Sequence, residues 1–143
     1  MIAQGVQLEA IGRRDRLPAS VARQLEESER RTSGGRKLRL RVALDYSSRQ
    51  SILDAAVRAQ SEDGTLTEEG IARFLGPPVD LLIRTSGEQR LSDFLLWESA
   101  YAELIFMEAM WPEFTVRELA AAVEEFHRRE RRFGAVTSSR RTA

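Results

Sequence analysis

The sequence has 143 residues, of which 42% are hydrophobic and 31% are charged, and its 22 basic and 22 acidic residues give a formal net charge of zero. This composition predicts one soluble globular domain over residues 1–143, and the balanced charge argues against nucleic acid as a partner. The lack of cysteine excludes disulfides and thiolate metal sites. The single histidine, His127, argues against a histidine metal cluster and a Ser-His-Asp triad.

The two ends of the sequence carry different signals. The first residues lack the charged start and apolar run of a signal peptide, and no window approaches the ~18 apolar residues of a membrane-spanning helix. We therefore expect a cytoplasmic protein with at most peripheral contact with a membrane. Residues 135–143 are predicted to form a flexible tail.

The first third of the chain predicts a strand, a helix and a second strand. A short, moderately apolar stretch predicts a strand at 6–11, and Pro18 suits the first turn of a helix that extends to Arg31. Alternating Leu, Val and Arg residues predict the second strand at 38–44.

The middle of the chain predicts two helices. Ser47 or Ser48 can cap a helix over 50–60, because a serine hydroxyl accepts a hydrogen bond from a free N–H of the first turn. A shorter helix is expected at 67–75, before a Gly-Pro-Pro sequence that stops it.

The last part of the chain predicts a buried strand, a segment of helical character and another strand, at 79–83, 92–101 and 103–107. Thr115 and Glu118 form a capping box at the start of a final helix, which Gly134 is expected to end. Strands and helices thus alternate, which predicts an α/β protein with a mainly parallel sheet flanked by helices.

The turn after the strand at 79–83 contains the candidate anion-binding residues. Ligands of open parallel sheets bind beyond the carboxyl ends of the strands, where helix N-termini attract anions. Arg84 and Arg90 offer planar guanidinium groups that match phosphate oxygens, and Gly87 permits a tight turn between them. Ser92 can cap the next helix or donate to the anion.

Residue spacing alone leaves other interpretations open. Arg84 and Arg90 can instead form a local salt-bridge cluster with Glu88 and Asp93. A generic phosphate-binding α/β domain would also explain the two arginines, but it leaves the motifs described next unexplained.

The segment from Asp80 to Phe114, together with a motif at Arg131, resembles the cis-prenyltransferases, the family of undecaprenyl and polyprenyl diphosphate synthases. The matching motifs are Asp-Leu-Leu-Ile-Arg-Thr-Ser-Gly-Glu from Asp80, Arg-Leu-Ser-Asp-Phe-Leu-Leu-Trp from Arg90, Tyr-Ala-Glu from Tyr101, Trp-Pro-Glu-Phe from Trp111 and Arg-Arg-Phe-Gly from Arg131. Several motifs in the same order over more than fifty residues make the resemblance specific.

The resemblance implies roles for particular residues. Those it assigns to isopentenyl diphosphate are Arg84, Arg90, Leu91, Ser92, Arg132 and Gly134. Glu103 resembles a carboxylate that helps to hold Mg²⁺, and Mg²⁺ is the cofactor that the resemblance implies. Without the resemblance, the residue pattern predicts only an acidic residue at the edge of a strand. Arg132 and Gly134 resemble an element that often reaches the site of a partner subunit, and the arginine run there is also compatible with a solvated helix end.

The sequence also departs from the family pattern. The family's Met-Asp-Gly-Asn-x-Arg and Ser-x-Glu-Asn-Trp motifs, which serve the allylic diphosphate, do not occur, so we expect an incomplete version of the cis-prenyltransferase fold that resembles its C-terminal part. Asp45-Tyr46-Ser47-Ser48-Arg49 stands where family members show Asn-Tyr-Gly-Gly-Arg, which predicts a stiffer turn with an added negative charge.

The function implied by the resemblance is prenyl transfer, in which isopentenyl diphosphate condenses with an allylic diphosphate. The alternative is a non-catalytic diphosphate-binding or partner subunit that lacks the allylic site. The family resemblance also implies a homodimer, or a heteromer with a related subunit.

Overall fold

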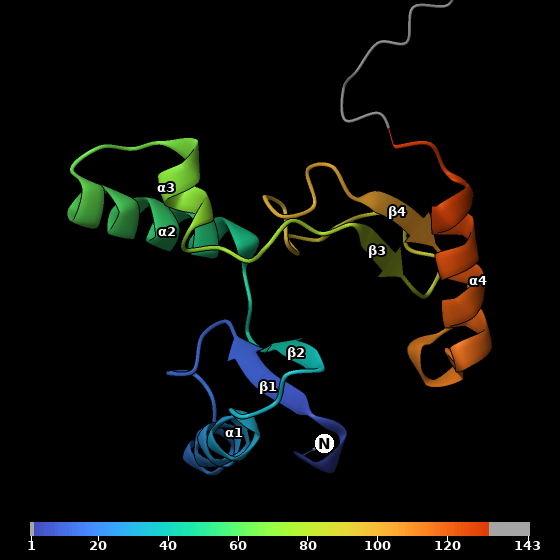
Figure 1. Cartoon of the computed structure of the whole chain (residues 1–143), viewed down its shortest axis with the longest axis horizontal. Helices are drawn as coiled ribbons and strands as arrows, with labels where there is room; N and C mark the ends of the chain where they lie inside the picture. Colours follow the sequence, from blue (N-terminus) through green and yellow to red (C-terminus); the bar gives the residue numbers. More distant parts are fainter. Residues whose placement is uncertain (1, 132–143) are drawn as a thin grey trace, which may run out of the picture.

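The computed structural model describes residues 2–131, and Figure 1 shows helices and strands interspersed along them, with α2 and α3 consecutive and no helix between β3 and β4. The elements are η1 (Ile2–Gln4), β1 (Val6–Ile11), α1 (Ala19–Thr32), β2 (Leu38–Ala43), α2 (Ser48–Asp63), α3 (Glu68–Ala72), β3 (Leu81–Arg84), β4 (Glu103–Phe106), η2 (Trp111–Glu113) and α4 (Val116–Arg128). The predicted fold class, α/β with parallel strands flanked by helices, is confirmed. None of the helices in this part of the chain is long and apolar enough to cross a membrane.

The first structural unit consists of β1, α1 and β2. The two strands pair in parallel over their whole lengths, starting with Val6 opposite Leu38, and α1 provides the crossover that a parallel pair requires. Gly12 follows β1 with a φ of 103°, and a Cβ atom there would lie 2.1 Å from the carbonyl oxygen of Leu44. Only glycine allows the chain to leave the sheet this closely.

The two middle helices form a pair that begins with predicted caps. The Ser47 hydroxyl accepts a hydrogen bond from the N–H of Gln50 (3.2 Å), and the Thr67 hydroxyl accepts one from the N–H of Gly70 (3.0 Å). Gly70 and Ala59 are both buried where α3 meets α2. Small side chains therefore allow these two helices to approach closely.

The second structural unit consists of β3, β4 and α4. β3 and β4 pair in parallel, with Leu81 opposite Glu103 and Arg84 opposite Phe106. Leu82 is buried in the centre of β3. Figure 1 shows α4 beside this strand pair, on the β4 side.

Helix α4 starts as predicted but ends earlier. The capping box is present, since the N–H of Thr115 donates to the Glu118 carboxylate (2.9 Å). The predicted end at Gly134 is wrong, because the helix ends at Arg128 and Arg129 has extended backbone with a ψ of 138°. The extended backbone coincides with hydrogen bonds from the Arg129 side chain to β4. Gly134 itself lies outside the described residues.

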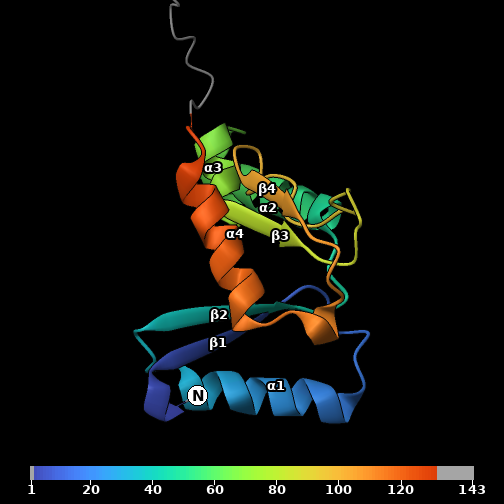
Figure 2. The same ribbon diagram turned by 90° about the vertical axis from the view of Figure 1, so that its right-hand side faces the viewer.

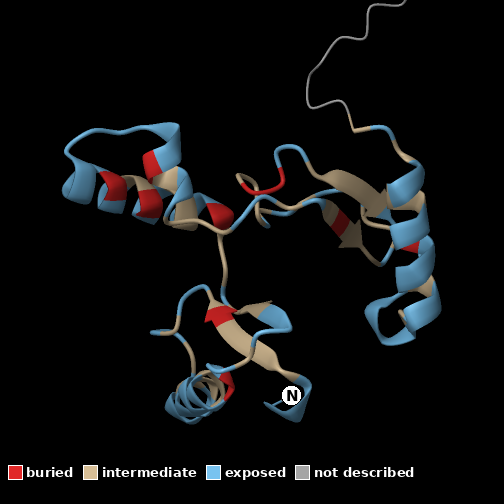
Figure 3. Ribbon diagram, viewed as in Figure 1, coloured by how far each residue is buried: buried red, intermediate tan, exposed pale blue. Residues whose placement is uncertain are grey.

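The strands form two sheets of two strands each, where we expected one sheet of four. Figure 2 shows the two pairs stacked along one direction, with β2 and β3 as the inner strands and with α1 beyond β1. The buried apolar side chains in the described residues are few and mostly small, and they are Ala10, Ala55, Ala59, Leu82 and Ala122 (Figure 3). Each unit therefore has only a small core of its own.

Candidate functional site

The predicted site begins where β3 ends at Arg84. The next turn is joined to the chain after β4, because the N–H groups of Ser86 and Gly87 donate to the carbonyl oxygens of Ala109 and Met107 (2.9 Å each). Gly87 has a φ of 68°. The carboxyl ends of β3 and β4 are thus fixed next to each other, which places Arg84 at the kind of sheet edge where ligands of α/β proteins bind.

The two arginines of the predicted site differ in their surroundings. The half-buried Arg84 side chain makes no hydrogen bond or ion pair with any residue between 2 and 131. Arg90 is exposed and pairs with Glu88, as one alternative interpretation of the spacing expected. Asp93, the other acid in that interpretation, pairs with neither arginine.

The segment 92–101 is a series of turns, and the helical character predicted for it is wrong. Ser92, Asp93 and Leu95 have positive φ angles of 50°, 63° and 45°, which interrupt a right-handed helix. Ser92 is exposed and caps no helix, so the predicted helix N-terminus does not form beside the arginines. Leu91 lies half-buried at the start of these turns, and its carbonyl oxygen accepts from the N–H of Phe94 (3.1 Å).

Asp93 instead fastens this loop to the start of α2. Its carboxylate accepts hydrogen bonds from the Ser47 hydroxyl (2.6 Å) and the N–H of Arg49 (3.0 Å). The hydrogen bond from Ser47, followed by that from Arg49, lowers the pKa of Asp93 below its ordinary value. One of the free N–H groups at the start of α2, that of Arg49, therefore binds a carboxylate of the protein itself.

Ser48 completes the same connection from the other side. Its N–H donates to the Asp93 carbonyl oxygen (3.0 Å), and its fully buried hydroxyl accepts from the N–H of Leu96 (2.9 Å). Our sequence interpretation considered Ser48 only as a possible cap and Asp93 only as a partner for arginine. The signal available in the sequence was the pair of adjacent serines at the start of a helix. The first N–H groups of a helix lack partners within it, so a distant residue such as Asp93 can accept hydrogen bonds from them.

The added negative charge of Asp45 is balanced locally. Its carboxylate lies 3.3 Å from the Arg16 guanidinium, and its backbone has a φ of 46°. This turn at the end of β2 therefore has a left-handed non-glycine residue, as does the turn after β3.

Glu103, the predicted metal ligand, lies at the opposite end of the β3–β4 pair from Arg84. It faces Leu81, three residues before Arg84, which corresponds to about 10 Å along a strand. Its carboxylate accepts a hydrogen bond from Arg129 (3.0 Å), and this bond is the main reason that the pKa of Arg129 is raised. The structure therefore does not bring Glu103 and Arg84 together within this chain.

The surroundings of Glu103 do not suit a metal ion as they stand. The neighbouring carboxylate, Asp80, is hydrogen-bonded to Arg131 (2.7 Å), so each of the two acids has an arginine partner. Nowhere in residues 2–131 do three or more metal-ligating side chains come together. Arg132 and Gly134, also assigned by resemblance, lie outside the described residues.

These features define an α/β protein whose candidate anion site lies at the carboxyl end of a parallel strand. The family model described as "Putative undecaprenyl diphosphate synthase" matches residues 1–134, and the chain belongs to this family.

Two curated relatives show how much of a family member the chain represents. Isoprenyl transferase 1 of Bradyrhizobium diazoefficiens is 52% identical over 139 residues, which cover 94% of this chain and 56% of the relative. The ditrans,polycis-undecaprenyl-diphosphate synthase ((2E,6E)-farnesyl-diphosphate specific) of Francisella tularensis is 46% identical over 134 residues, which cover 87% of this chain and 52% of the relative. The chain thus spans little more than half the length of these relatives.

Two solved structures are similar in fold. A probable undecaprenyl diphosphate synthase from Campylobacter jejuni matches with a TM-score of 0.88 and 36% identity, over 93% of this chain and 65% of that one. Lavandulyl diphosphate synthase from Lavandula x intermedia, in complex with dimethylallyl diphosphate, matches with a TM-score of 0.85 and 32% identity, over 92% of this chain and 61% of that one. The arrangement of the two strand pairs is therefore that of larger proteins.

Proposed function

We propose that this chain carries the isopentenyl diphosphate site of a prenyltransferase, which condenses isopentenyl diphosphate with an allylic diphosphate. The product would be a cis-polyprenyl or a short prenyl diphosphate. The observation that supports this most is the Arg84 guanidinium, which lies half-buried at the carboxyl end of β3 without an acidic partner in the described residues. A half-buried cation without a partner is a binding group for an anion.

Arg90 can join Arg84 at small cost. Its pair with Glu88 is on the surface, where the Arg90 side chain is 65% exposed, and such ion pairs contribute only about 0–1 kcal/mol. A diphosphate offers the guanidinium group two or more oxygens and more negative charge than one carboxylate. Binding of isopentenyl diphosphate would therefore replace Glu88, and the exposed Ser92 hydroxyl could donate to the same group.

The proposed chemistry assigns a holding role to these residues. In the condensation, the allylic C–O bond breaks and diphosphate leaves with the electron pair, while the double bond of isopentenyl diphosphate forms the new C–C bond and then loses a proton. Arg84 and Arg90 would fix the diphosphate of the attacking molecule and so orient its double bond. None of the described residues is assigned to the ionisation of the allylic partner.

Mg²⁺ remains a proposal that follows from the family. Diphosphate is a good partner for this hard cation. However, Glu103 is occupied by Arg129 and lies at the wrong end of the strand pair for Arg84, so we assign no step to a metal held by the described residues alone.

Calorimetry with isopentenyl diphosphate tests the assignment of the arginines. Arg84→Ala and Arg90→Ala should each weaken binding by about 1–3 kcal/mol, because each removes charge-assisted hydrogen bonds to the diphosphate. Arg36→Ala is the matched control, since Arg36 is exposed and far along the chain from the site. Unchanged affinity in both site variants would reject the proposal.

The alternative function is a non-catalytic diphosphate-binding subunit, or a partner subunit without an allylic site. The observation that favours it is that the Glu103 carboxylate is hydrogen-bonded to Arg129 and lies at the opposite end of the β3–β4 pair from Arg84. Incubation with radiolabelled isopentenyl diphosphate, farnesyl diphosphate and Mg²⁺ separates the two functions. Only a transferase adds the labelled unit to farnesyl diphosphate and so forms a longer labelled product. Binding without elongation would support the alternative. A homodimer or related heteromer, and a cytoplasmic location, stay predictions.

A further inference from the structure

The turn after β2 and the loop after β3 lie side by side. Four hydrogen bonds join them, and each connects a residue of 47–49 with a residue of 93–96. The ring of Tyr46 also meets the ring of Phe94 edge on, at 72° and with the ring centroids 5.8 Å apart. All of these contacts hold the same short segment of the loop.

Two of the four hydrogen bonds depend on serine hydroxyls. The Ser47 hydroxyl donates to a carboxylate oxygen of Asp93 (2.6 Å), and the Ser48 hydroxyl accepts from the N–H of Leu96 (2.9 Å). Both serines stand where the family pattern has glycine, which has no side chain to make either bond. The hydroxyl connection is therefore a feature of this chain's own sequence.

Ser48 holds the loop at two points. It is fully buried, so solvent does not compete for its hydroxyl. Its N–H also donates to the Asp93 carbonyl oxygen (3.0 Å). Removal of the hydroxyl would leave the N–H of Leu96 without the partner that it has inside the protein.

The segment held by these contacts has a strained backbone. Ser92, Asp93 and Leu95 have φ angles of 50°, 63° and 45°, a left-handed region that is unfavourable for residues with a side chain. Without the contacts to the two serines, the segment would relax toward right-handed or extended backbone. The contacts thus select one conformation of the loop.

Arg90 lies between two fixed points of this loop. Before it, the turn at 86–87 is bound to the chain that follows β4. After it, the N–H of Phe94 donates to the Leu91 carbonyl oxygen (3.1 Å) and closes the turn that contains Ser92. A change of backbone at the second fixed point therefore changes the direction in which the Arg90 side chain leaves the loop.

Arg84 is placed independently of these contacts. It is the last residue of β3, and its carbonyl oxygen accepts a hydrogen bond from the N–H of Met107 (2.8 Å). The strand pair therefore fixes its backbone whatever the loop does. The two arginines of the candidate site differ in what sets their positions, so an effect of the loop should reach Arg90 and not Arg84.

The same contacts occupy the acidic group next to Ser92. One oxygen of the Asp93 carboxylate accepts from the Ser47 hydroxyl, and the other accepts from the N–H of Arg49 (3.0 Å). A free carboxylate at this place would compete with a diphosphate for Arg90. The hydrogen bonds hold its charge at the start of α2 instead, where the helix dipole favours it.

We propose that Ser47 and Ser48 are positioning residues for isopentenyl diphosphate: their hydroxyls hold the segment 92–95 in the conformation that presents Arg90 and Ser92 to the diphosphate. This inference rests on the proposed function of the arginines. The serines act through Asp93 and Leu96 and touch no reacting atom. Because the loop is ordered before the ligand arrives, binding does not have to order it.

Calorimetry with isopentenyl diphosphate tests the role of Ser47. Ser47→Gly removes the hydroxyl but leaves an acceptable first residue for α2, and it should weaken binding by about three- to tenfold. Ser47→Thr keeps a hydroxyl and should bind within about twofold of the wild type. Equal affinity of the glycine variant and the wild type would overturn the inference.

A double-mutant cycle separates positioning from a loss of stability. In an Arg90→Ala background, Ser47→Gly should weaken binding less than it does alone, because one of the groups that Ser47 positions is gone. In an Arg84→Ala background, the effect of Ser47→Gly should be the same as in the wild type. Equal effects in all three backgrounds would contradict the inference.

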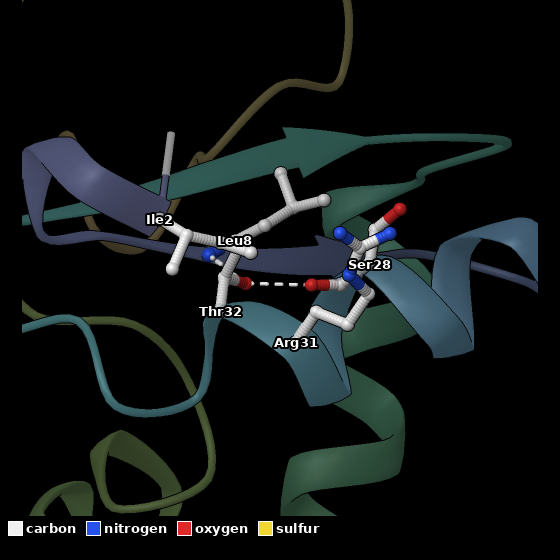
Figure 4. A pocket seen from close by; sticks show the side chains of 5 residues that line it. All are labelled: Ile2, Leu8, Ser28, Arg31 and Thr32. Carbon is white, nitrogen blue, oxygen red and sulfur yellow. Dashed lines mark hydrogen bonds between the residues drawn. The ribbon is translucent and has the colours of Figure 1, made fainter.

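Thr32 provides a matched control for Ser48. It is also buried, its hydroxyl accepts from the N–H of Leu8 (3.0 Å), and Figure 4 shows it beside Leu8. Ser48→Ala should weaken isopentenyl diphosphate by about three- to tenfold and speed hydrogen exchange at the Leu96 amide. Thr32→Val should lower the urea midpoint, as Ser48→Ala does, but leave binding unchanged. If both variants weaken binding alike, the inference is wrong.

The results also distinguish this inference from the proposed function. If the wild type does not bind isopentenyl diphosphate, the proposed function is wrong and the positioning role falls with it. If the wild type binds and the arginine variants weaken binding while the serine variants do not, the proposed function stands and the positioning role alone is rejected.

Discussion

The two structural units connect their parallel strands in different ways. β1 and β2 are joined through the 14-residue helix α1, whereas β3 and β4 are joined by a loop of successive turns. The non-glycine residues with positive φ in the described chain are Ser86, Ser92, Asp93 and Leu95, all in this loop, and Asp45 after β2. Strained backbone is thus concentrated at the candidate site, as is common where a loop must hold a ligand.

The two connections also differ in what holds them in place. The end of α1 is held against β1, because the Thr32 hydroxyl accepts a hydrogen bond from the N–H of Leu8. The loop between β3 and β4 depends on another part of the molecule, because Asp93 and Ser48 join it to α2. The site geometry is therefore set by tertiary contacts, while the first unit is organised mainly by its own residues.

The largest expected difference between the units concerns their cores. Leu82→Ala should lower the free energy of unfolding by about 2–5 kcal/mol, because Leu82 is the large buried side chain of the second unit. Leu40→Ala, the same change at an exposed position of β2, should cost much less. Urea denaturation measures both values, and equal losses would show that the two strands are packed alike.

A smaller effect is expected at the strained loop. Ser92→Gly should leave stability unchanged or raise it by up to about 1 kcal/mol, since glycine adopts a φ of 50° without strain. Ser92→Ala keeps the strain and should not be more stable than the wild type. If the hydroxyl binds diphosphate, both variants should weaken isopentenyl diphosphate in calorimetry. A clear loss of stability in the glycine variant would contradict the strain argument.

The smallest effect concerns the pH dependence of the connection to α2. The pKa of Asp93 is lowered, so its ionised form stabilises the fold fully above the ordinary carboxyl pKa of about 3.9, and this contribution is lost as the pH falls through the lowered value. The amide proton resonance of Arg49, which donates to Asp93, should titrate with a midpoint below that pH. Asp93→Asn should remove this transition, and a midpoint above 3.9 would contradict the proposed bonding.

Local signals in the sequence predicted most of the fold. Caps, alternation and apolar runs located the strands and the starts of the long helices, for example Ser47 before α2 and Thr115 before α4. The end of α4 was predicted wrongly because Arg129 turns out of the helix to bind β4, which is a long-range contact. The division into two strand pairs was missed for a similar reason, since strand pairing is not encoded in any one segment.

The candidate site was predictable only in part. The sequence correctly placed Arg84 at the end of a strand, although Leu82 is the one buried residue of β3, and the role of Arg84 in binding stays a prediction. The helix expected after Ser92 failed because left-handed residues and the bonds of Asp93 outweigh local helical preference. The separation of Glu103 from Arg84 follows from the parallel register, which the motif spacing did not reveal.

Among the described residues, β2 and β3 each pair with another strand on one side only, which leaves one backbone edge of each strand unpaired. These edges have a consequence for the handling of this chain in a cell. An unprotected strand edge is a template for any extended polypeptide, so freshly made molecules compete between correct assembly and aggregation. Chaperones and proteases act on partly exposed chains, so we expect such edges to be the parts of this chain that they meet first.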